Sequence, residues 1–170
     1  MKIFCIILLA LTSTQGFAQV LNQKTMDEKK HCEILIGNCN REGFTTCNFD
    51  SAYRAGYSSY SPDTSALHLL IPGMNFITIK LIMGTWCSDS KEQVPRFYKI
   101  LDLLKFDYNN LALICVDRTK AAPGIDLTPL NISLVPTFIF YRNSKEIGRI
   151  VETPTLSLEK DMLRIIGKVN

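Results

Sequence analysis

The sequence predicts an α/β domain in which a central mixed sheet is flanked by helices and preceded by an N-terminal helical extension. Three short apolar runs, typical of buried strands, alternate with segments whose apolar residues recur at helical period. The third run is followed by a polar turn and another extended segment, which predicts a hairpin beside a parallel pair of strands. A chain of 170 residues is the size of one globular domain.

Residues 1–18 have the pattern of a secretory signal peptide. Lys2 precedes an unbroken apolar run over residues 3–11, and the segment closes on Gly16-Phe17-Ala18, with small residues where signal peptidase reads. This run is too short for a membrane-spanning helix, which needs about 20 residues. We therefore expect cleavage near Ala18, export to the periplasm or the extracellular space, and no membrane span afterwards.

Residues 19–73 are predicted to form the helical extension. Residues 25–38 favour helix and end at a Gly-Asn stop, and residues 45–60 form a second helical stretch. A short third helix begins at 61–63, where a proline stands at a first-turn position, and ends at 72–73. The second stretch places four aromatic side chains on one face, which we expect to pack against the core: Phe49, Tyr53, Tyr57 and Tyr60.

Residues 74–170 are predicted to form the α/β domain itself. In chain order we expect a strand at 76–83, a helix at 89–105, a strand at 111–116, a weak helical turn at 124–130, a strand at 137–141, its hairpin partner at 146–151 and a last helix at 156–166.

Charge and metal-ligand spacing exclude two classes of partner. The 19 basic and 16 acidic residues are scattered, so no electrostatic footprint for nucleic acid is present. Cys32, Cys39 and Cys47 are seven and eight residues apart, wider than the spacing within a structural zinc pair. We expect His31 and His68 to be surface residues, and we expect neither a metal nor a cofactor.

The cysteine count indicates at least one unpaired thiol. Five cysteines remain after residue 18, and an exported protein can keep disulfides. If Cys32 and Cys39 share one helix, their Cα atoms lie about 10 Å apart, beyond the reach of a disulfide. We therefore expect a Cys39–Cys47 bridge, with Cys32 left as a possible resolving thiol. Cys115, centred in an apolar strand, is expected to be a core residue.

Cys87 occupies the position best suited to chemistry. It falls where the first strand of the domain ends and the following helix begins. Unpaired backbone N–H groups and the positive end of the helix dipole stabilise a thiolate there. Lys91 would support the anion, whereas Asp89 would oppose it if it points back towards the sulfur. The alternative is a small buried hydrophobic residue.

The spacing of these residues resembles the thioredoxin superfamily. The resemblance covers residues 76–166 and consists of Trp86-Cys87, Pro95 eight residues after the cysteine, and Val135-Pro136-Thr137 before a hairpin. Residues 84–90, 94–98 and 148–152 also look like a group of exported bacterial thioredoxin-like proteins with a Trp-Cys-x-x-Ser motif.

This resemblance implies a thioredoxin-like fold, Cys87 as the nucleophile, and a cis peptide bond before Pro136 that places the proline beside the sulfur. The residues implied to contact the substrate are Trp86, Ser90, Val135, Pro136 and Thr137. A second interpretation of Ser90 is a first-turn residue that satisfies backbone donors.

Two departures from the pattern limit the expected chemistry. Ser90 stands where a dithiol enzyme has its resolving cysteine, and Leu81 stands where many thioredoxins have a buried acid. A lone thiolate can still form a mixed disulfide that a second thiol resolves.

We therefore predict a monothiol thiol-disulfide oxidoreductase or isomerase of the cell envelope. Its partner would be a thiol- or disulfide-bearing protein or a small thiol. The alternative is a redox-inert thioredoxin-fold module that binds proteins or acts like a chaperone, which would tolerate replacement of Cys87. A peroxidase ranks third, because Thr85 lies two rather than three residues before Cys87. No feature indicates an oligomeric state.

Overall fold

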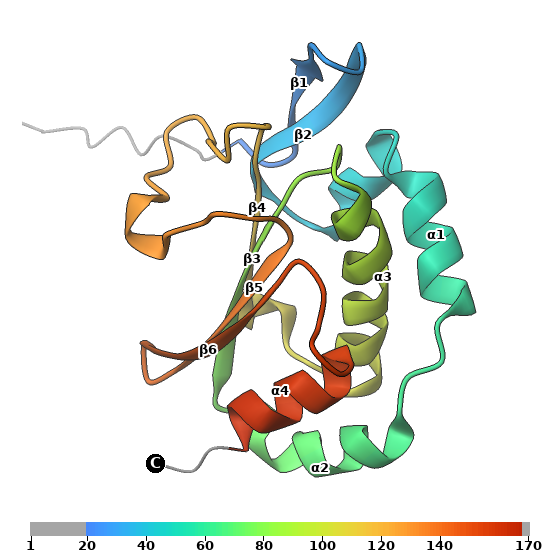
Figure 1. The fold of residues 1–170 in the computed structure, drawn as a ribbon, viewed down its shortest axis with the longest axis vertical. Helices are drawn as coiled ribbons and strands as arrows, with labels where there is room; N and C mark the ends of the chain where they lie inside the picture. Colours follow the sequence, from blue (N-terminus) through green and yellow to red (C-terminus); the bar gives the residue numbers. More distant parts are fainter. Residues whose placement is uncertain (1–19, 168–170) are drawn as a thin grey trace, which may run out of the picture.

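A six-stranded mixed sheet in the order β1-β2-β4-β3-β5-β6 forms the centre of the structure (Figure 1). The computed structural model describes residues 20–167, so the predicted signal peptide lies outside the described residues. The strands are β1 (Gln23–Asp27), β2 (Cys32–Cys39), β3 (Ile77–Met83), β4 (Leu111–Cys115), β5 (Thr137–Arg142) and β6 (Lys145–Val151).

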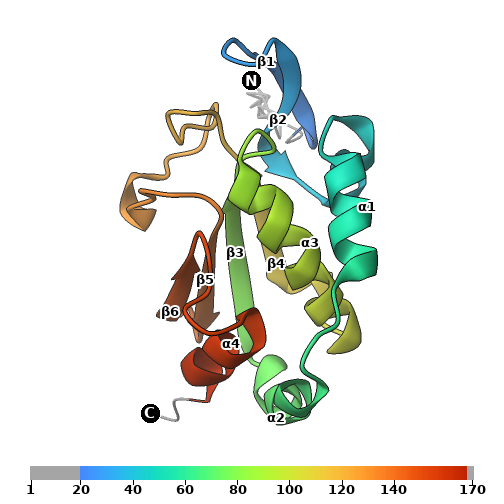
Figure 2. The same cartoon turned by 45° about the vertical axis from the view of Figure 1, so that its right-hand side comes forward.

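The α-helices of the described part all lie on one side of this sheet (Figures 1 and 2). Alternate residues of each central strand, such as Leu81 of β3 and Phe138 of β5, join the main core beneath them. Residues of opposite parity, such as Ile82, form a smaller cluster under the loop between β4 and β5. The α-helices are α1 (Asp50–Ser59), α2 (Thr64–Met74), α3 (Ser88–Leu103) and α4 (Leu158–Ile166), and the 3-10 turns are η1 (Arg41–Thr46), η2 (Tyr108–Asn110) and η3 (Thr128–Leu130).

The domain predicted over residues 74–170 has the expected element order. Strand β3 runs parallel to β4 and antiparallel to β5, and β5 and β6 form the predicted hairpin. Helix α3 connects the parallel pair, and α4 follows the hairpin, capped by Ser157. Strand, helix, strand, hairpin and helix in this arrangement make a thioredoxin-like fold.

The helix predicted over residues 25–38 is wrong, because this segment forms the β1–β2 hairpin. The last residues of β2 pair antiparallel with β4, in the register Gly37↔Cys115 to Cys39↔Leu113. Helix-favouring residues in this stretch are overridden by pairing with a strand far away in the sequence. The N-terminal region therefore widens the same sheet instead of forming a purely helical extension.

The aromatic stripe predicted on the second helix does pack inwards. Phe49 and Tyr53 are buried, and their rings contact Phe44 of η1. Tyr57 and Tyr60 lie partly buried at the edge of the core. Helix α1 thereby lies along the outer side of α3 (Figure 1). The next helix, α2, is capped by Asp63 and runs slightly past its predicted end, to Met74.

A charged network fastens this N-terminal layer to α3. The guanidinium of Arg41 forms two hydrogen bonds to the carboxylate of Asp102, at 2.8 and 3.0 Å. The hydroxyl groups of Tyr57 and Tyr108 also donate to Asp102. Burial alone would raise the pKa of Asp102, but these donors outweigh it and lower the pKa. The layer that carries η1 and α1 is thus held against α3 by a satisfied ionic group.

Candidate functional site

Cys87 is the N-cap residue of α3, immediately after the loop that leaves β3. Its backbone is fixed on both sides: its N–H donates to Gly84 and its carbonyl accepts from Lys91. The side chain does not cap the helix, so the sulfur remains available to other groups. Cys87 is 8% exposed and lines a hollow of about 320 Å³ together with Trp86, Arg118 and Val135.

The Val135–Pro136 peptide bond is cis, as the resemblance to the thioredoxin superfamily implies. The thiol of Cys87 donates to the carbonyl oxygen of Val135 at 3.1 Å. Asp89 Oδ2 lies 3.9 Å from the same sulfur. The sulfur and the segment before β5 are therefore in direct contact, although they are 48 residues apart in the sequence.

Opposing charges surround the Cys87 sulfur. The carbonyl oxygen of Val135 and the carboxylate of Asp89 place negative charge near it. The N-terminus of α3 and the guanidinium of Arg118, which lines the same hollow, place positive charge nearby. The pKa of Arg118 is raised, chiefly by its hydrogen bond to Asp27 and also by the charges of Cys32 and Cys87.

Trp86 is held in place by three separate contacts. Its indole N–H donates to the carbonyl of Val116 at 2.8 Å. The guanidinium of Arg118 lies over the ring, 4.8 Å from its centroid. Gly84 packs under the ring so closely that a Cβ there would lie 2.5 Å from indole atoms. The sequence motif contains Gly84, but only the structure shows that its missing side chain makes room for the tryptophan.

Ser90 is fully buried, which corrects the prediction that it contacts substrate. Its hydroxyl oxygen accepts a hydrogen bond from the N–H of Gly84 at 3.4 Å, closing the junction between β3 and α3. The second interpretation of Ser90, a first-turn residue that satisfies a backbone donor, describes this geometry. Thr137 is also buried, and its hydroxyl donates to the carbonyl of Leu134. Both side chains are buried and form hydrogen bonds to the backbone next to the site.

Outside residues 84–90, four residues that the sequence interpretation did not assign to the site line the hollow beside Cys87. They are Arg118, Lys120 and Leu134 from the loop between β4 and β5, and Glu152 just after β6. Leu134 is 43% exposed and places an apolar side chain beside the thiol. Glu152 entered the sequence interpretation only within the resemblance over residues 148–152, and no spacing or periodicity marks the three loop residues, which reach the site only in three dimensions.

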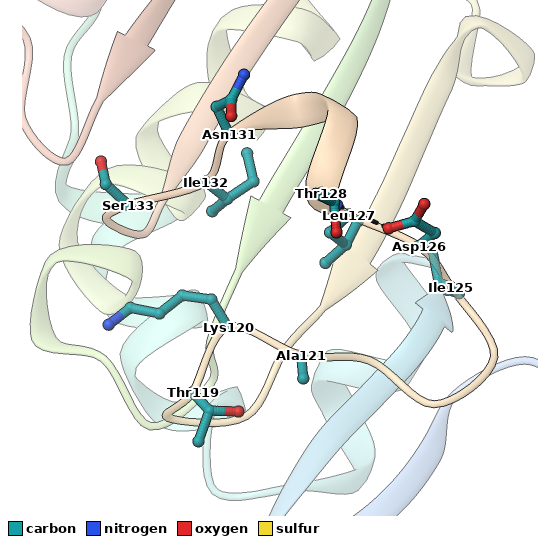
Figure 3. A pocket seen from close by; sticks show the side chains of 10 residues that line it. All are labelled: Thr119, Lys120, Ala121, Ile125, Asp126, Leu127, Thr128, Asn131, Ile132 and Ser133. Carbon is teal, nitrogen blue, oxygen red and sulfur yellow. Dashed lines mark hydrogen bonds between the residues drawn. The ribbon is translucent and has the colours of Figure 1, made fainter.

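A second hollow, of about 580 Å³, adjoins the first and also has Lys120 in its wall. It lies within the β4–β5 loop, between the segments 119–121 and 125–133 (Figure 3). Its wall is mixed, with hydroxyl and amide groups beside Ile125, Leu127 and Ile132. The surface next to Cys87 is therefore concave over a wider area than the thiol alone requires.

The predicted Cys39–Cys47 bridge is not formed, because both residues are free thiols in the structure. Its premise fails as well: Cys32 and Cys39 stand at opposite ends of β2, in an extended segment instead of one helix. Cys39 turns into the core towards Cys115. A hydrogen bond between their sulfurs, together with complete burial, raises the pKa of the Cys115 thiol. Cys115 is a core residue, as expected.

Cys32 lies near the site, at the start of β2, and is half-buried. The side-chain amide of Asn48 donates to its sulfur at 3.1 Å.

Leu81, where many thioredoxins carry an acid, is fully buried and supplies no proton relay. His31 and His68 are exposed, as predicted. Within residues 20–167, no group of three or more potential ligands is arranged to hold a metal ion, and no helix is long and apolar enough to cross a membrane.

Comparisons with known proteins support the fold alone. No protein-family model matches the chain, and no curated protein matches its sequence. A crystal structure of a protein of unknown function from Pseudomonas aeruginosa is 15% identical, with a TM-score of 0.54 over 70% of this chain and 84% of that one. An HIV epitope scaffold is 16% identical, with a TM-score of 0.52 over 72% and 86%. Oxidised thioredoxin O2 from Arabidopsis thaliana is 20% identical, with a TM-score of 0.40 over 61% and 85%.

Proposed function

We propose that this protein is a thiol-disulfide oxidoreductase or isomerase that uses Cys87 as its nucleophile. The observation that carries the proposal is the placement of one sulfur at a helix N-terminus, in contact with the residue before a cis proline and lining an open hollow. The signal-like pattern of residues 1–18 further supports work outside the cytoplasm, where substrate disulfides persist.

The reaction begins when Cys87 loses its proton and its hydrogen bond to Val135. The thiolate forms a bond to one sulfur of a substrate disulfide, the substrate S–S bond breaks, and the other sulfur leaves as a thiolate that takes up a proton. The product is a mixed disulfide on Cys87. Ser90 cannot resolve it, because a hydroxyl forms no disulfide and this one is buried. A second thiol must therefore release the substrate.

The walls of the hollow suit a protein or peptide disulfide. Trp86 offers a fixed aromatic surface and Leu134 an exposed apolar one in the same hollow as the sulfur. Lys120 and Glu152 supply charges of both signs. The adjoining hollow in the β4–β5 loop gives room for residues that flank the reacting cysteine of a substrate.

The test is covalent capture at Cys87. Reduced protein is mixed at neutral pH with the aromatic disulfide dithiobisnitrobenzoate and quenched with acid at short times, and peptide mass spectrometry locates the adduct. We expect it on the tryptic peptide 81–91. The Cys87→Ser variant should lose this adduct, whereas the Cys47→Ser variant should keep it. A folded wild-type protein that leaves Cys87 unmodified would rule out the proposed chemistry.

A redox-inert protein-binding module is the second candidate. It is favoured by the hydrogen bond from the Cys87 thiol to the carbonyl of Val135, which must break before the sulfur can attack a disulfide. The absence of an acid at Leu81 points in the same direction. On this view the Cys87→Ser variant keeps full binding to unfolded client proteins, measured as suppression of their aggregation, whereas replacement of Leu134 by Asp weakens it.

A further inference from the structure

The end of β2 that carries Cys32 projects beyond the sheet and lies beside Trp86. Strand β2 pairs with β4 only from Gly37 to Cys39, so residues 32–36 extend past the carboxyl end of β4. The N–H of Leu35 donates to the hydroxyl of Thr85, which ties this projecting segment to the loop that leads to Cys87. The β1–β2 hairpin lies near the start of α3 (Figure 2), and Cys32 lines a hollow with Trp86 and Ser88 of the β3–α3 junction.

The two thiols face adjoining hollows. Cys32 lines a hollow of about 360 Å³ with Asn48 and Lys91, and Cys87 lines the hollow of about 320 Å³ described above. Trp86 and Ser88 belong to both walls. Trp86 and the exposed Ser88 are therefore the residues that the two hollows share.

The Cys32 sulfur is held by a polar partner in a hollow with basic lining residues. Asn48 donates a hydrogen bond to the sulfur, and Lys30 and Lys91 line the same hollow. Arg118, stacked on Trp86, is affected electrostatically by both Cys32 and Cys87. Asp27 is the carboxylate in contact with Arg118, and both of its oxygens are engaged by that guanidinium.

We propose that Cys32 is the resolving thiol for Cys87, which would make the protein a dithiol enzyme whose two cysteines come from different elements. This inference rests on the proposed function. The Cys32 thiolate attacks the Cys87 sulfur of the mixed disulfide, a Cys32–Cys87 bond forms, and the bond from Cys87 to the substrate breaks. The substrate sulfur leaves as a thiolate and is protonated, so one substrate disulfide is reduced and one protein disulfide is formed.

Closure of this bond requires the hairpin end to move across Trp86. Residues 28–31 form an exposed turn, and ahead of Gly37 the strand β2 has no partner in β4. Strand β1 is the edge of the sheet and pairs with β2 alone. A shift of the hairpin tip would leave the hydrogen bonds between β2 and β4 in place, but the Leu35–Thr85 hydrogen bond and the Asp27–Arg118 contact would have to accommodate it.

The test follows what happens to the adduct on Cys87. In the wild-type protein, the nitrobenzoate adduct should disappear with release of a second thionitrobenzoate, and the tryptic peptides 31–41 and 81–91 should become disulfide-linked. Fragmentation must place the link on Cys32 and not on Cys39, which shares its peptide. In the Cys32→Ser variant the adduct on Cys87 should persist and no second thiolate should appear.

Matched variants separate this inference from the proposed function. Cys47→Ser, at another half-buried thiol of the N-terminal region, should resolve like the wild type. Asn48→Ala should slow the second release by several-fold and leave the first unchanged. If the adduct forms on Cys87 but persists equally in the wild type and in Cys32→Ser, the resolving role is excluded while the nucleophile stands. If no adduct forms on Cys87, the proposed function itself fails.

Discussion

At the scale of single residues, the contacts of Trp86 hold the wall of the thiol site in a fixed position. The carbonyl of Val116 fixes the indole N–H, Arg118 covers one region of the ring, and Gly84 lies against it without a side chain. The ring is thus fixed in the wall shared by the hollow of Cys87 and the hollow of Cys32. A change at any of these contacts alters the wall that both hollows share.

Gly84→Ala should displace Trp86 and weaken the site. The added methyl group would overlap the indole, and overpacking of this kind costs about 1–3 kcal/mol of stability. The chain has a single tryptophan, so its fluorescence emission reports the displacement directly. We also expect slower adduct formation on Cys87. Ser88→Ala, at an exposed position of the same junction, serves as the control; unchanged emission in Gly84→Ala would contradict the packing described here.

The five described cysteines should differ sharply in native reactivity. Cys39 and Cys115 are buried in the core, and the pKa of Cys115 is raised, so both should react with iodoacetamide only after unfolding. Cys32 and Cys87 line hollows and should be labelled in the native state. Peptide mass spectrometry before and after denaturation measures the difference. Rapid native labelling of Cys115 would show that the core around β4 opens.

At the scale of elements, ion pairs attach the N-terminal additions to the thioredoxin-like body. Asp102 anchors η1 and α1 to α3 through Arg41 and two tyrosine hydroxyls. Asp27, which is 4% exposed, anchors the β1–β2 hairpin through a two-pronged contact with Arg118. Each addition therefore depends on one carboxylate.

Asp102→Asn should destabilise the protein by about 2 kcal/mol, because charged hydrogen bonds are lost in a partly buried place. The pKa of Asp102 is lowered in the folded state, so its contribution is full above the unfolded value of about 3.9 and disappears as the pH falls through the folded pKa. Urea unfolding at neutral and acidic pH measures both effects. The difference between wild type and variant should shrink in acid.

The control for Asp102 is Asp50→Asn, which removes an exposed ion pair with Arg54 one helical turn away. Such pairs contribute about 0.5 kcal/mol or less. Equal losses of unfolding free energy in the two variants would show that the network around Asp102 contributes no more to stability than an exposed ion pair does.

Asp27→Asn should loosen the hairpin without unfolding the body of the protein. The variant keeps the shape of the side chain but loses the charge that Arg118 engages. Hydrogen exchange should become faster in β1 and in residues 32–36, while the amides of β3 keep their protection. Glu33→Gln, which breaks the exposed pair with Lys24 in the same hairpin, should leave exchange unchanged. Uniform acceleration across the whole sheet would contradict a local role.

At the scale of the whole molecule, the helices protect one face of the sheet and leave the thiol site at the edge of the other. Helices α1 to α4 cover the main core, whereas the smaller cluster under the β4–β5 loop includes Cys87 and Val135. The site therefore lies where the rigid sheet meets a long loop and a projecting hairpin. The sheet and α3 hold Cys87 in place. The β4–β5 loop and the β1–β2 hairpin form the surfaces around it that a substrate would contact.

Local patterns in the sequence determined the thioredoxin-like body: the apolar runs of β3, β4 and β5, the helical periods of α3 and α4, and the position of Cys87 between strand and helix. These features depend on residues that are close together in the sequence, so the sequence alone predicts them. The cis peptide bond before Pro136 was implied by the resemblance of a short motif, Val135-Pro136-Thr137, to the thioredoxin superfamily.

Only the tertiary structure decided that residues 23–27 and 32–39 are strands, that Ser90 is buried at the junction of β3 and α3, and that Cys32 and Trp86 line the same hollow. The physical reason is the range of the interactions. Helix propensity in that stretch is worth fractions of a kcal/mol per residue, and pairing with β4, about 75 residues further along the chain, outweighs it.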